Sequence, residues 1–349
     1  MEAYLYSVSD NNNIRCGLCS HRCKIREGRR GICNVRENRN GRLYSLVYEK
    51  LIARNVDPIE KKPLFHMLPG SLSYSIATAG CNFRCRFCQN SDIAQMPSDR
   101  GGQIAGRRTA PEEILADAVR SGCKTIAYTY TEPTVYFEYA YETARLARKK
   151  GIRNIFVSNG FMTRECIDML SPYLDGANID LKAFRDDFYK NYCGARLEPV
   201  KENLKYIKSK DILLEVTTLL IPGLNDSTEE LEDLAGFIAN DLGKETPWHI
   251  SRFHPTYRLT NRPSTPLKSL ERAREIGIRA GLDYVYMGNV PGTGGEDTLC
   301  PGCGKTLIER RGFSVSRNLV QKGVCPDCAT VIYGVGMSGE QICSSSIGQ

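Results

Sequence analysis

The chain has 349 residues, of which 41% are hydrophobic and 25% charged, and its formal net charge is +7. A chain of this length can form one large α/β domain with small appended modules. It has no apolar run of about 18 residues and no basic-then-apolar start, which argues against a membrane span or a secretory signal, so we expect a cytoplasmic protein.

The 15 cysteines fall mostly in short, metal-type spacings. Because disulfide frameworks belong to small secreted domains, this usage indicates a reducing compartment and metal sites. Metal-bound thiolates carry negative charge that the formal count omits, so the basic excess does not by itself predict nucleic-acid binding. We expect a four-cysteine module at 1–70, a barrel at 71–290, and a two-knuckle zinc module with a flexible tail at 291–349.

The first part contains a closed set of four cysteines. These are Cys16, Cys19, Cys23 and Cys33. Four thiolates match a structural zinc site, and they would also hold an iron–sulfur cluster. Zinc is preferred, but both remain open. Lys61, Lys62 and His66 follow, and they form either a surface loop around a packed Phe65 or part of the active site.

Residues 71–290 alternate strand and helix patterns, which predicts βα units around a parallel sheet. Strands are expected at Tyr74–Ala79, Thr125–Tyr130, Asn154–Ser158, Ala177–Leu181, Leu213–Leu220, Trp248–Phe253 and, as a seventh, Tyr284–Met287. Helices are expected at Pro111–Ser121, Val135–Lys150, Thr163–Ser171, Glu198–Ser209, Thr228–Leu242 and Pro266–Ala280. Six repeats predict a partial TIM-like (β/α)6 barrel, whose reacting groups lie at the C-terminal ends of the strands.

The first of these strands ends in a short loop with three cysteines, Cys81, Cys85 and Cys88. Cluster irons are normally held by four thiolates, so a local set of three predicts a [4Fe-4S] cluster with one open iron. A zinc knuckle that lacks a ligand, or buried apolar thiols, would be the alternatives. The aromatic Phe87 before the last cysteine and the strand-then-loop context favour the cluster.

With this loop, the sequence resembles the radical S-adenosylmethionine (SAM) superfamily. The resemblance implies that SAM chelates the open iron, and that Phe87 and Asn90 of the loop belong to the cofactor-binding set. It also implies a one-electron reductant of the ferredoxin or flavodoxin type.

Polar residues end the next three strands and fit that resemblance. Glu132 and Thr129 stand where radical SAM enzymes often carry a Gly-Gly-Glu-like segment that holds the amino group of SAM, although this chain lacks the two glycines. Asn159 ends the third strand. Asp180 and Lys182 end the fourth and, being two residues apart, face one ligand. The Lys182 cation would suit the SAM carboxylate, and the Asp180 anion would suit the ribose hydroxyls.

The last strands add Glu215, the turn that begins at Ile221, whose backbone could line an adenine, and His254. Each residue also has a structural alternative. Glu215 and Asp180 would form a salt-bridge network in the barrel, His254 would be a turn histidine, and Asn159 would be a left-handed turn residue.

Two finer resemblances follow from the motifs. Asp180-Leu181-Lys182 and Phe253-His254 match the pyruvate formate-lyase activating enzyme-like branch. The whole chain is more similar to the radical SAM enzyme of the AmmeMemoRadiSam system, through the four-cysteine head, the segment Asp57–His66, Tyr-Thr-Glu-Pro-Thr and the cysteine-rich tail. That name is a genomic grouping, and it implies Memo-type and AMMECR-type proteins as partners.

The function implied is reductive cleavage of SAM to a 5′-deoxyadenosyl radical, which abstracts hydrogen from a substrate that the resemblance does not name. Activation of a glycyl-radical enzyme is an alternative within this class. A non-catalytic metal-binding scaffold for protein or RNA is the alternative of another class.

The last part contains two C-x2-C knuckles after a glycine-rich linker. They are Cys300, Cys303, Cys325 and Cys328, a spacing typical of a zinc ribbon. Because four thiolates close the coordination sphere, we expect this module to serve docking or closure of the open side of the barrel more than chemistry. The remaining cysteines are expected to be core or tail thiols: Cys123, Cys166, Cys193 and Cys343.

Overall fold

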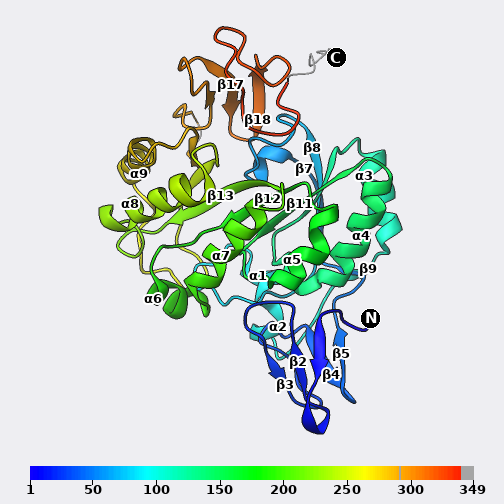
Figure 1. Ribbon diagram of the computed structural model, residues 1–349. Helices are drawn as coiled ribbons and strands as arrows, with labels where there is room; N and C mark the ends of the chain where they lie inside the picture. Colours follow the sequence, from blue (N-terminus) through cyan, green and yellow to red (C-terminus); the bar gives the residue numbers. More distant parts are fainter. Residues whose placement is uncertain (291, 339–349) are drawn as a thin grey trace, which may run out of the picture.

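The structure is a computed structural model that describes residues 1–290 and 292–338. Its centre is an eight-stranded sheet in the order β15-β14-β13-β12-β11-β10-β8-β7 (Figure 1). The strands are β7 Ala53–Pro58, β8 Leu72–Ala77, β10 Thr125–Tyr128, β11 Arg153–Ser158, β12 Gly176–Asp180, β13 Leu213–Leu220, β14 Trp248–Arg252 and β15 Val285–Gly288. All pairs from β8 to β15 are parallel. The expected α/β fold is confirmed, and the open order of strands is compatible with a partial barrel.

Six helices connect the parallel strands and lie along the outside of the sheet (Figure 1). They are α3 Pro111–Arg120, α4 Phe137–Lys149, α5 Arg164–Leu170, α7 Leu197–Lys208, α8 Thr228–Phe237 and α9 Leu267–Arg279. Side-chain caps fix two of their starts, because Thr163 accepts from the Cys166 amide and Ser227 from the Glu230 amide. The apolar faces of the helices cover buried strand residues such as Ile126.

Strand β7 has no counterpart in the sequence-based expectations. It pairs antiparallel with β8 over six residues, from Ala53↔Ala77 to Pro58↔Leu72. Its residues are mostly polar or exposed, because an edge strand has no neighbour on its outer side. The sequence around Ala53 therefore lacks the apolar run that reveals the buried parallel strands.

The cysteine-rich modules lie at opposite ends of the molecule (Figure 1). The N-terminal module contains β1 Tyr6–Val8, β2 Ile14–Cys16, β3 Lys24–Ile25, β4 Arg36–Arg39 and β5 Arg42–Ser45. The C-terminal module is a three-stranded antiparallel sheet of β16 Thr298–Leu299, β17 Thr306–Arg311 and β18 Ser314–Asn318. Short connecting elements are β6 Lys50–Leu51, β9 Arg107–Arg108, α1 Ser91–Ala94, α2 Met96–Asp99 and α6 Asp186–Phe188.

Two expectations concern residues that the structure leaves out. Cys343 and the expected flexible tail beyond residue 338 lie outside the described residues.

Within residues 1–290 and 292–338, the longest helices are too short and too polar to cross a membrane.

Candidate active site

A cavity of about 560 Å³ lies at the C-terminal ends of the parallel strands. This volume falls within the range of roughly 300–1,000 Å³ that is usual for small-molecule sites. Ten of the residues expected from the sequence line it: Cys81, Cys85, Phe87, Cys88, Asn90, Thr129, Glu132, Asn159, Asp180 and Lys182. Residues from loops after four neighbouring strands therefore meet at one edge of the sheet, as expected for a barrel enzyme.

The cysteine loop leaves β8 through Gly80, a position that only glycine fits. Its φ is +106°, and a Cβ atom there would lie 2.7 Å from the Val35 side chain. The loop is then held by backbone bonds, since the Arg84 amide donates to the Cys193 carbonyl at 2.8 Å. At the far end of the loop, the Asn90 side chain donates to the Tyr130 carbonyl at 2.8 Å. These bonds hold the loop at both ends.

The three thiols of this loop fit an iron–sulfur cluster with one open iron. All three line the same cavity. The Phe83 amide points at the Cys81 sulfur at 3.3 Å, an N–H···S contact of the kind that tunes cluster ligands. Cys85 is 7% exposed, whereas Cys81 and Cys88 are half-buried.

Glu132 is buried and faces the cavity after β10. Its Oε1 accepts from the Thr134 amide and hydroxyl and from the Ser158 hydroxyl. Among the described residues, Oε2 accepts from one donor, the Asn159 amide at 2.8 Å. A carboxylate can accept about four bonds, two on each oxygen, so Oε2 keeps room for one more donor. Burial raises the pKa of Glu132, and these hydrogen bonds act in the opposite direction. A bound ammonium group would stabilise the ionised form further.

Asp180 and Lys182 lie in contact at the end of β12. The Lys182 ammonium is 2.8 Å from the Asp180 carboxylate and 5.9 Å from the centre of the Phe87 ring. Burial would lower the pKa of Lys182, but the Asp180 charge raises it well above its usual value, so the lysine is a fixed cation. Beside Asp180 in the sheet register stands Thr217. Its buried hydroxyl lines the cavity and has no hydrogen-bond partner among the described residues, which fits a polar ligand there.

The structure places three expected cofactor-binding residues away from the cavity wall. Glu215 pairs with His249 at 2.6 Å and accepts from the amides of residues 65 and 66, so its carboxylate is used structurally. Ile221 is buried, and its amide donates to the Asn225 side chain. His254 is exposed and contacts the Ser264 hydroxyl at 3.1 Å, which is the turn-histidine alternative.

The turn after β11 also differs from the alternative in which Asn159 is a left-handed turn residue. Gly160, and not Asn159, takes the left-handed conformation, with φ +70°. The Asn159 side chain instead donates to the Asn82 side chain at 2.7 Å, next to Cys81.

The segment before β8 contributes to the cavity wall. The sequence had left open whether this segment is a surface loop or part of the active site. The Lys62 side chain is 1% exposed, and its ammonium lies 2.5 Å from the Asp57 carboxylate and 4.5 Å from the centre of the Tyr130 ring. Burial lowers the pKa of Lys62 to about 8. Glu60 and Lys61 line the same wall. His66 lies deeper, between the Tyr333 carbonyl and the Tyr286 hydroxyl at 2.6 and 2.7 Å.

Three further residues of the wall come from the C-terminal module, and no motif in the sequence indicated them. They are Glu296, Gly312 and Phe313. The turn between β17 and β18 carries Phe313, and the Gly312 amide in that turn donates to the Glu296 carboxylate at 2.9 Å. The C-terminal module therefore forms part of the cavity wall.

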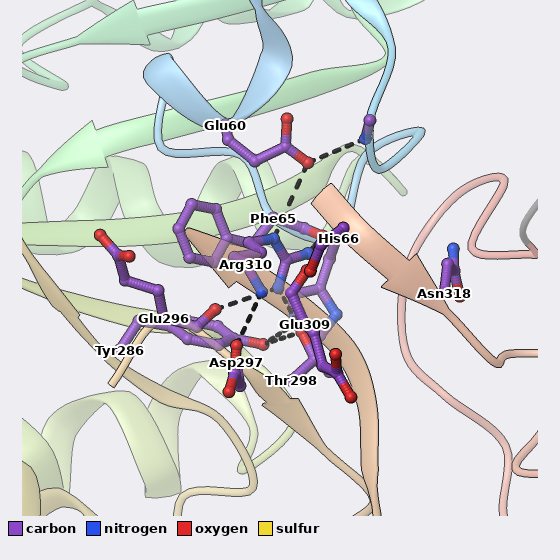
Figure 2. Close-up of polar contacts among 12 residues, drawn as sticks. Glu60, Phe65, His66, Tyr286, Glu296, Asp297, Thr298, Glu309, Arg310 and Asn318 are labelled. Atoms are coloured by element: carbon purple, nitrogen blue, oxygen red, sulfur yellow. Dashed lines mark hydrogen bonds and ion pairs between the residues drawn. The ribbon is translucent and has the colours of Figure 1, made fainter. Parts of the chain in front are cut away.

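Arg310 on β17 docks this module on the barrel (Figure 2). Its guanidinium is fully buried and donates to the Phe65 carbonyl at 2.9 Å and the Thr298 hydroxyl at 2.7 Å. It also lies 4.3 Å from the Phe65 ring centre and 3.7 Å from the Glu60 carboxylate. Arg310 thus ties the module to the segment that forms the cavity wall.

The four C-terminal cysteines form a metal site. All four sulfurs lie within 4.8 Å of one another, and Cys300 and Cys328 are 3.5 Å apart while Cys303 and Cys325 are 3.8 Å apart. Four thiolates around one tetrahedral zinc ion at about 2.3 Å would stand roughly 3.8 Å apart. The spacing of the four sulfurs fits a single metal ion.

Cys325→Ala should unfold this module locally. The apparent binding energy of a structural zinc site in zinc-finger peptides is about 10–16 kcal/mol, which is ample to fold a short segment with a small core. We expect faster proteolysis within residues 300–336, measured by mass spectrometry of the fragments, and loss of one metal equivalent. Cys123→Ala, which removes a buried thiol outside the site, is the control and should leave this region protected. Equal protection of both variants would contradict a structural metal.

His66 predicts that the docked module is sensitive to acid. Burial lowers its pKa from 6.5 to about 4, so the unfolded chain binds a proton more tightly than the folded one. This contribution to stability is present above pH 6.5 and is lost as the pH falls toward 4, by about 3 kcal/mol in total. Urea unfolding at pH 7 and 4.5 should show a smaller loss for His66→Gln than for the unaltered chain. An equal loss of stability in both proteins would contradict the role of His66 in this sensitivity to acid.

Comparison with known proteins agrees with this site. The family described as the radical SAM superfamily matches residues 75–238. The uncharacterized protein MJ0808 of Methanocaldococcus jannaschii is 49% identical over 313 residues, which cover 90% of this chain and 92% of that protein. Pyruvate formate-lyase 1-activating enzyme of Escherichia coli is 24% identical over 183 residues, 50% of this chain and 71% of that enzyme.

A solved domain of a pyruvate-formate lyase-activating enzyme from Bacteroides vulgatus is 17% identical, with a TM-score of 0.42, and the match covers 47% of this chain and 98% of that domain.

The chain therefore belongs to the radical SAM superfamily, in the branch that resembles pyruvate formate-lyase activating enzyme. It is a radical SAM enzyme, which confirms the class expected from the cysteine loop and excludes the non-catalytic scaffold. Membership in this superfamily implies a [4Fe-4S] cluster, SAM and a reductant.

Proposed function

We propose that the protein cleaves SAM reductively in the cavity described above and uses the product radical to take a hydrogen atom from a substrate held in the same cavity. The observation that carries this proposal is the meeting of three thiols, a buried carboxylate and a fixed lysine on one wall. When bound, the cluster supplies one electron to the sulfonium of SAM, which gives methionine and a 5′-deoxyadenosyl radical.

The chain's own residues orient SAM through its charged ends. Glu132 Oε2, with its remaining acceptor site, accepts from the SAM ammonium. Lys182 binds the SAM carboxylate, and Asp180, released from Lys182, accepts from the ribose hydroxyls. Charge-assisted hydrogen bonds of this kind contribute about 1.5–3 kcal/mol each.

The opposite wall binds the substrate in this proposal. It contains Glu60 and Lys61 from the segment before β8 and Phe313 from the C-terminal turn, so it combines acidic, basic and aromatic side chains. The docked module also shields the radical from water and competing hydrogen donors, which is the main task of the protein around such a cofactor. We assign zinc to the four C-terminal cysteines because their spacing suits one tetrahedral ion.

The finer assignment is to the radical SAM enzyme of the AmmeMemoRadiSam system, with Memo-type and AMMECR-type partners and a ferredoxin- or flavodoxin-type reductant. It is supported by the Asp57–His66 segment that the resemblance rests on, several of whose residues line the cavity. Activation of a glycyl-radical enzyme is the second candidate, because the relatives include two Methanocaldococcus jannaschii proteins named putative glycyl-radical enzyme activating enzymes.

Lys182→Ala should weaken SAM binding about ten- to a hundred-fold, since the loss of one charge-assisted contact corresponds to roughly 1.5–3 kcal/mol. The cluster content should not change. Isothermal titration of the reconstituted protein under anaerobic conditions measures the affinity. Lys208→Ala, which removes a lysine paired with Glu245 outside the cavity, is the matched control. Unchanged SAM affinity in Lys182→Ala would assign Lys182 a structural role only.

Deuterium transfer tests hydrogen abstraction. Anaerobic, reconstituted protein is incubated with SAM, dithionite and a deuterium-labelled cell extract that has been separated into small molecules and proteins. We expect deuterium in 5′-deoxyadenosine with one of the two fractions. The small-molecule fraction would support the substrate cavity, and the protein fraction would support glycyl-radical activation. Unlabelled 5′-deoxyadenosine with both would contradict the abstraction step.

A further inference from the structure

The four cysteines of the N-terminal module surround a second, smaller cavity. Cys16 ends β2, and Cys19, Cys23 and Cys33 follow in the loops around β3. All four line a cavity of about 20 Å³, whose wall also contains apolar residues such as Leu18. A cavity of roughly 10–15 Å³ can already hold one water molecule. The four thiols therefore surround an open space and do not pack against one another.

We propose that this cavity holds a second iron–sulfur cluster and not the zinc ion that the sequence favoured. The spacing of the sulfurs is the first reason. In the part of the chain that the structure describes, the C-terminal cysteines bring their sulfurs within 4.8 Å of one another, whereas the N-terminal four do not form such a group. Four thiolates on one zinc ion stand only about 3.8 Å apart.

The loop of Cys81, Cys85 and Cys88 provides an internal comparison. Its sulfurs, expected to bind a cubane, likewise do not gather within 4.8 Å in the described part of the chain. A cluster has a separate iron under each thiolate or pair of thiolates, so it keeps its ligands farther apart than a single ion does. The N-terminal set shares this wider arrangement with the cluster loop.

Arg36 is the second reason. Its side chain is 2% exposed and lines the small cavity. Two of its nitrogens are used, because Nη1 bonds to Glu138 at 2.9 Å and Nη2 to the Tyr4 carbonyl at 2.7 Å. Its Nε has no hydrogen-bond partner among residues 1–290 and 292–338. A buried donor without a partner is costly, and the sulfurs of an anionic cluster would accept its bond.

The proposed cluster would lie directly behind the cysteine loop. Asn82 and Thr134 line the small cavity, and their near neighbours Cys81 and Glu132 line the large one. His21, between two of the N-terminal cysteines, contacts the Asn82 carbonyl at 2.8 Å. The segments around residues 81–82 and 132–134 therefore contribute to the walls of both cavities.

Metal analysis of the full chain tests this proposal without SAM. The variant C81A/C85A/C88A, reconstituted with iron and sulfide under anaerobic conditions, should keep about two to four iron atoms per chain, with acid-labile sulfide and visible absorbance, because only the loop cluster is lost. Adding Cys23→Ala and Cys33→Ala to this variant should remove the remaining iron. Adding Cys303→Ala and Cys328→Ala should remove zinc and leave that iron in place.

Two zinc equivalents and no iron in C81A/C85A/C88A would overturn the proposal, and so would iron that disappears with Cys303 and Cys328. If that variant does not fold, the unaltered chain decides. About six to eight iron atoms per chain support two clusters, whereas about four, with two zinc ions, contradict them. None of these measurements depends on SAM cleavage, so this inference and the proposed function can fail separately.

Discussion

Formation of 5′-deoxyadenosine should fall below detection when Cys81, Cys85 and Cys88 are replaced by alanine. The three thiols line the cavity at the end of β8, and thiolates are the usual ligands of such clusters. Without them the cofactor has no attachment in this wall. The metal of the C-terminal module should remain, because its four cysteines form a separate group in another part of the chain (Figure 1).

The control for this variant is C123A/C166A, which removes two buried thiols outside the cavity. It should retain the cluster and cleave SAM at close to the original rate. Liquid chromatography with mass detection of 5′-deoxyadenosine measures both proteins. Cleavage of SAM by the variant that lacks the three loop cysteines would show that the cluster is held elsewhere.

The second large effect is expected from Arg310→Met. The substitution leaves the Glu60 carboxylate, which is fully buried, without its counter-charge and removes the bonds to Phe65 and Thr298 (Figure 2). Removing one partner of a buried ion pair typically costs about 3–5 kcal/mol. We expect urea unfolding to show a loss of this size and limited proteolysis to release the C-terminal module.

Arg317→Met is the matched control on the neighbouring strand. Its guanidinium is 56% exposed and pairs with Glu309 at 3.2 Å, and exposed pairs contribute only about 0–1 kcal/mol. Similar stability of both variants would contradict the docking role of Arg310.

The parallel sheet was predictable because its strands are buried on both faces and read as apolar runs. Strand β13 has the bounds Leu213–Leu220 in both the expectation and the structure. Strand β7 was missed, because its exposed edge gives no such run. The helix expected at Thr228–Leu242 ends its regular part at Phe237 and continues in a wider turn, a change that periodicity does not reveal.

The candidate site was predictable where it depends on strand ends. Asp180 and Lys182 could be placed because residues at the C-terminal ends of parallel strands meet at one edge. Glu215 also lies on a barrel strand, but two residues before Thr217 and therefore farther from the C-terminal end of the strand. Its carboxylate pairs with His249, and no sequence pattern shows that pairing. Phe313 is more than two hundred residues from the cysteine loop, and the docking of the C-terminal module, to which Arg310 contributes, brings it to the cavity.

One measurement tests the central claim most directly. The reconstituted, unaltered chain is mixed with SAM under anaerobic conditions, with and without dithionite, and 5′-deoxyadenosine and methionine are quantified. We predict equal amounts of both products, formed only when the reductant is present, because one electron cleaves one sulfonium bond. Protein with a full complement of iron and bound SAM that forms no 5′-deoxyadenosine under these conditions would contradict the claim.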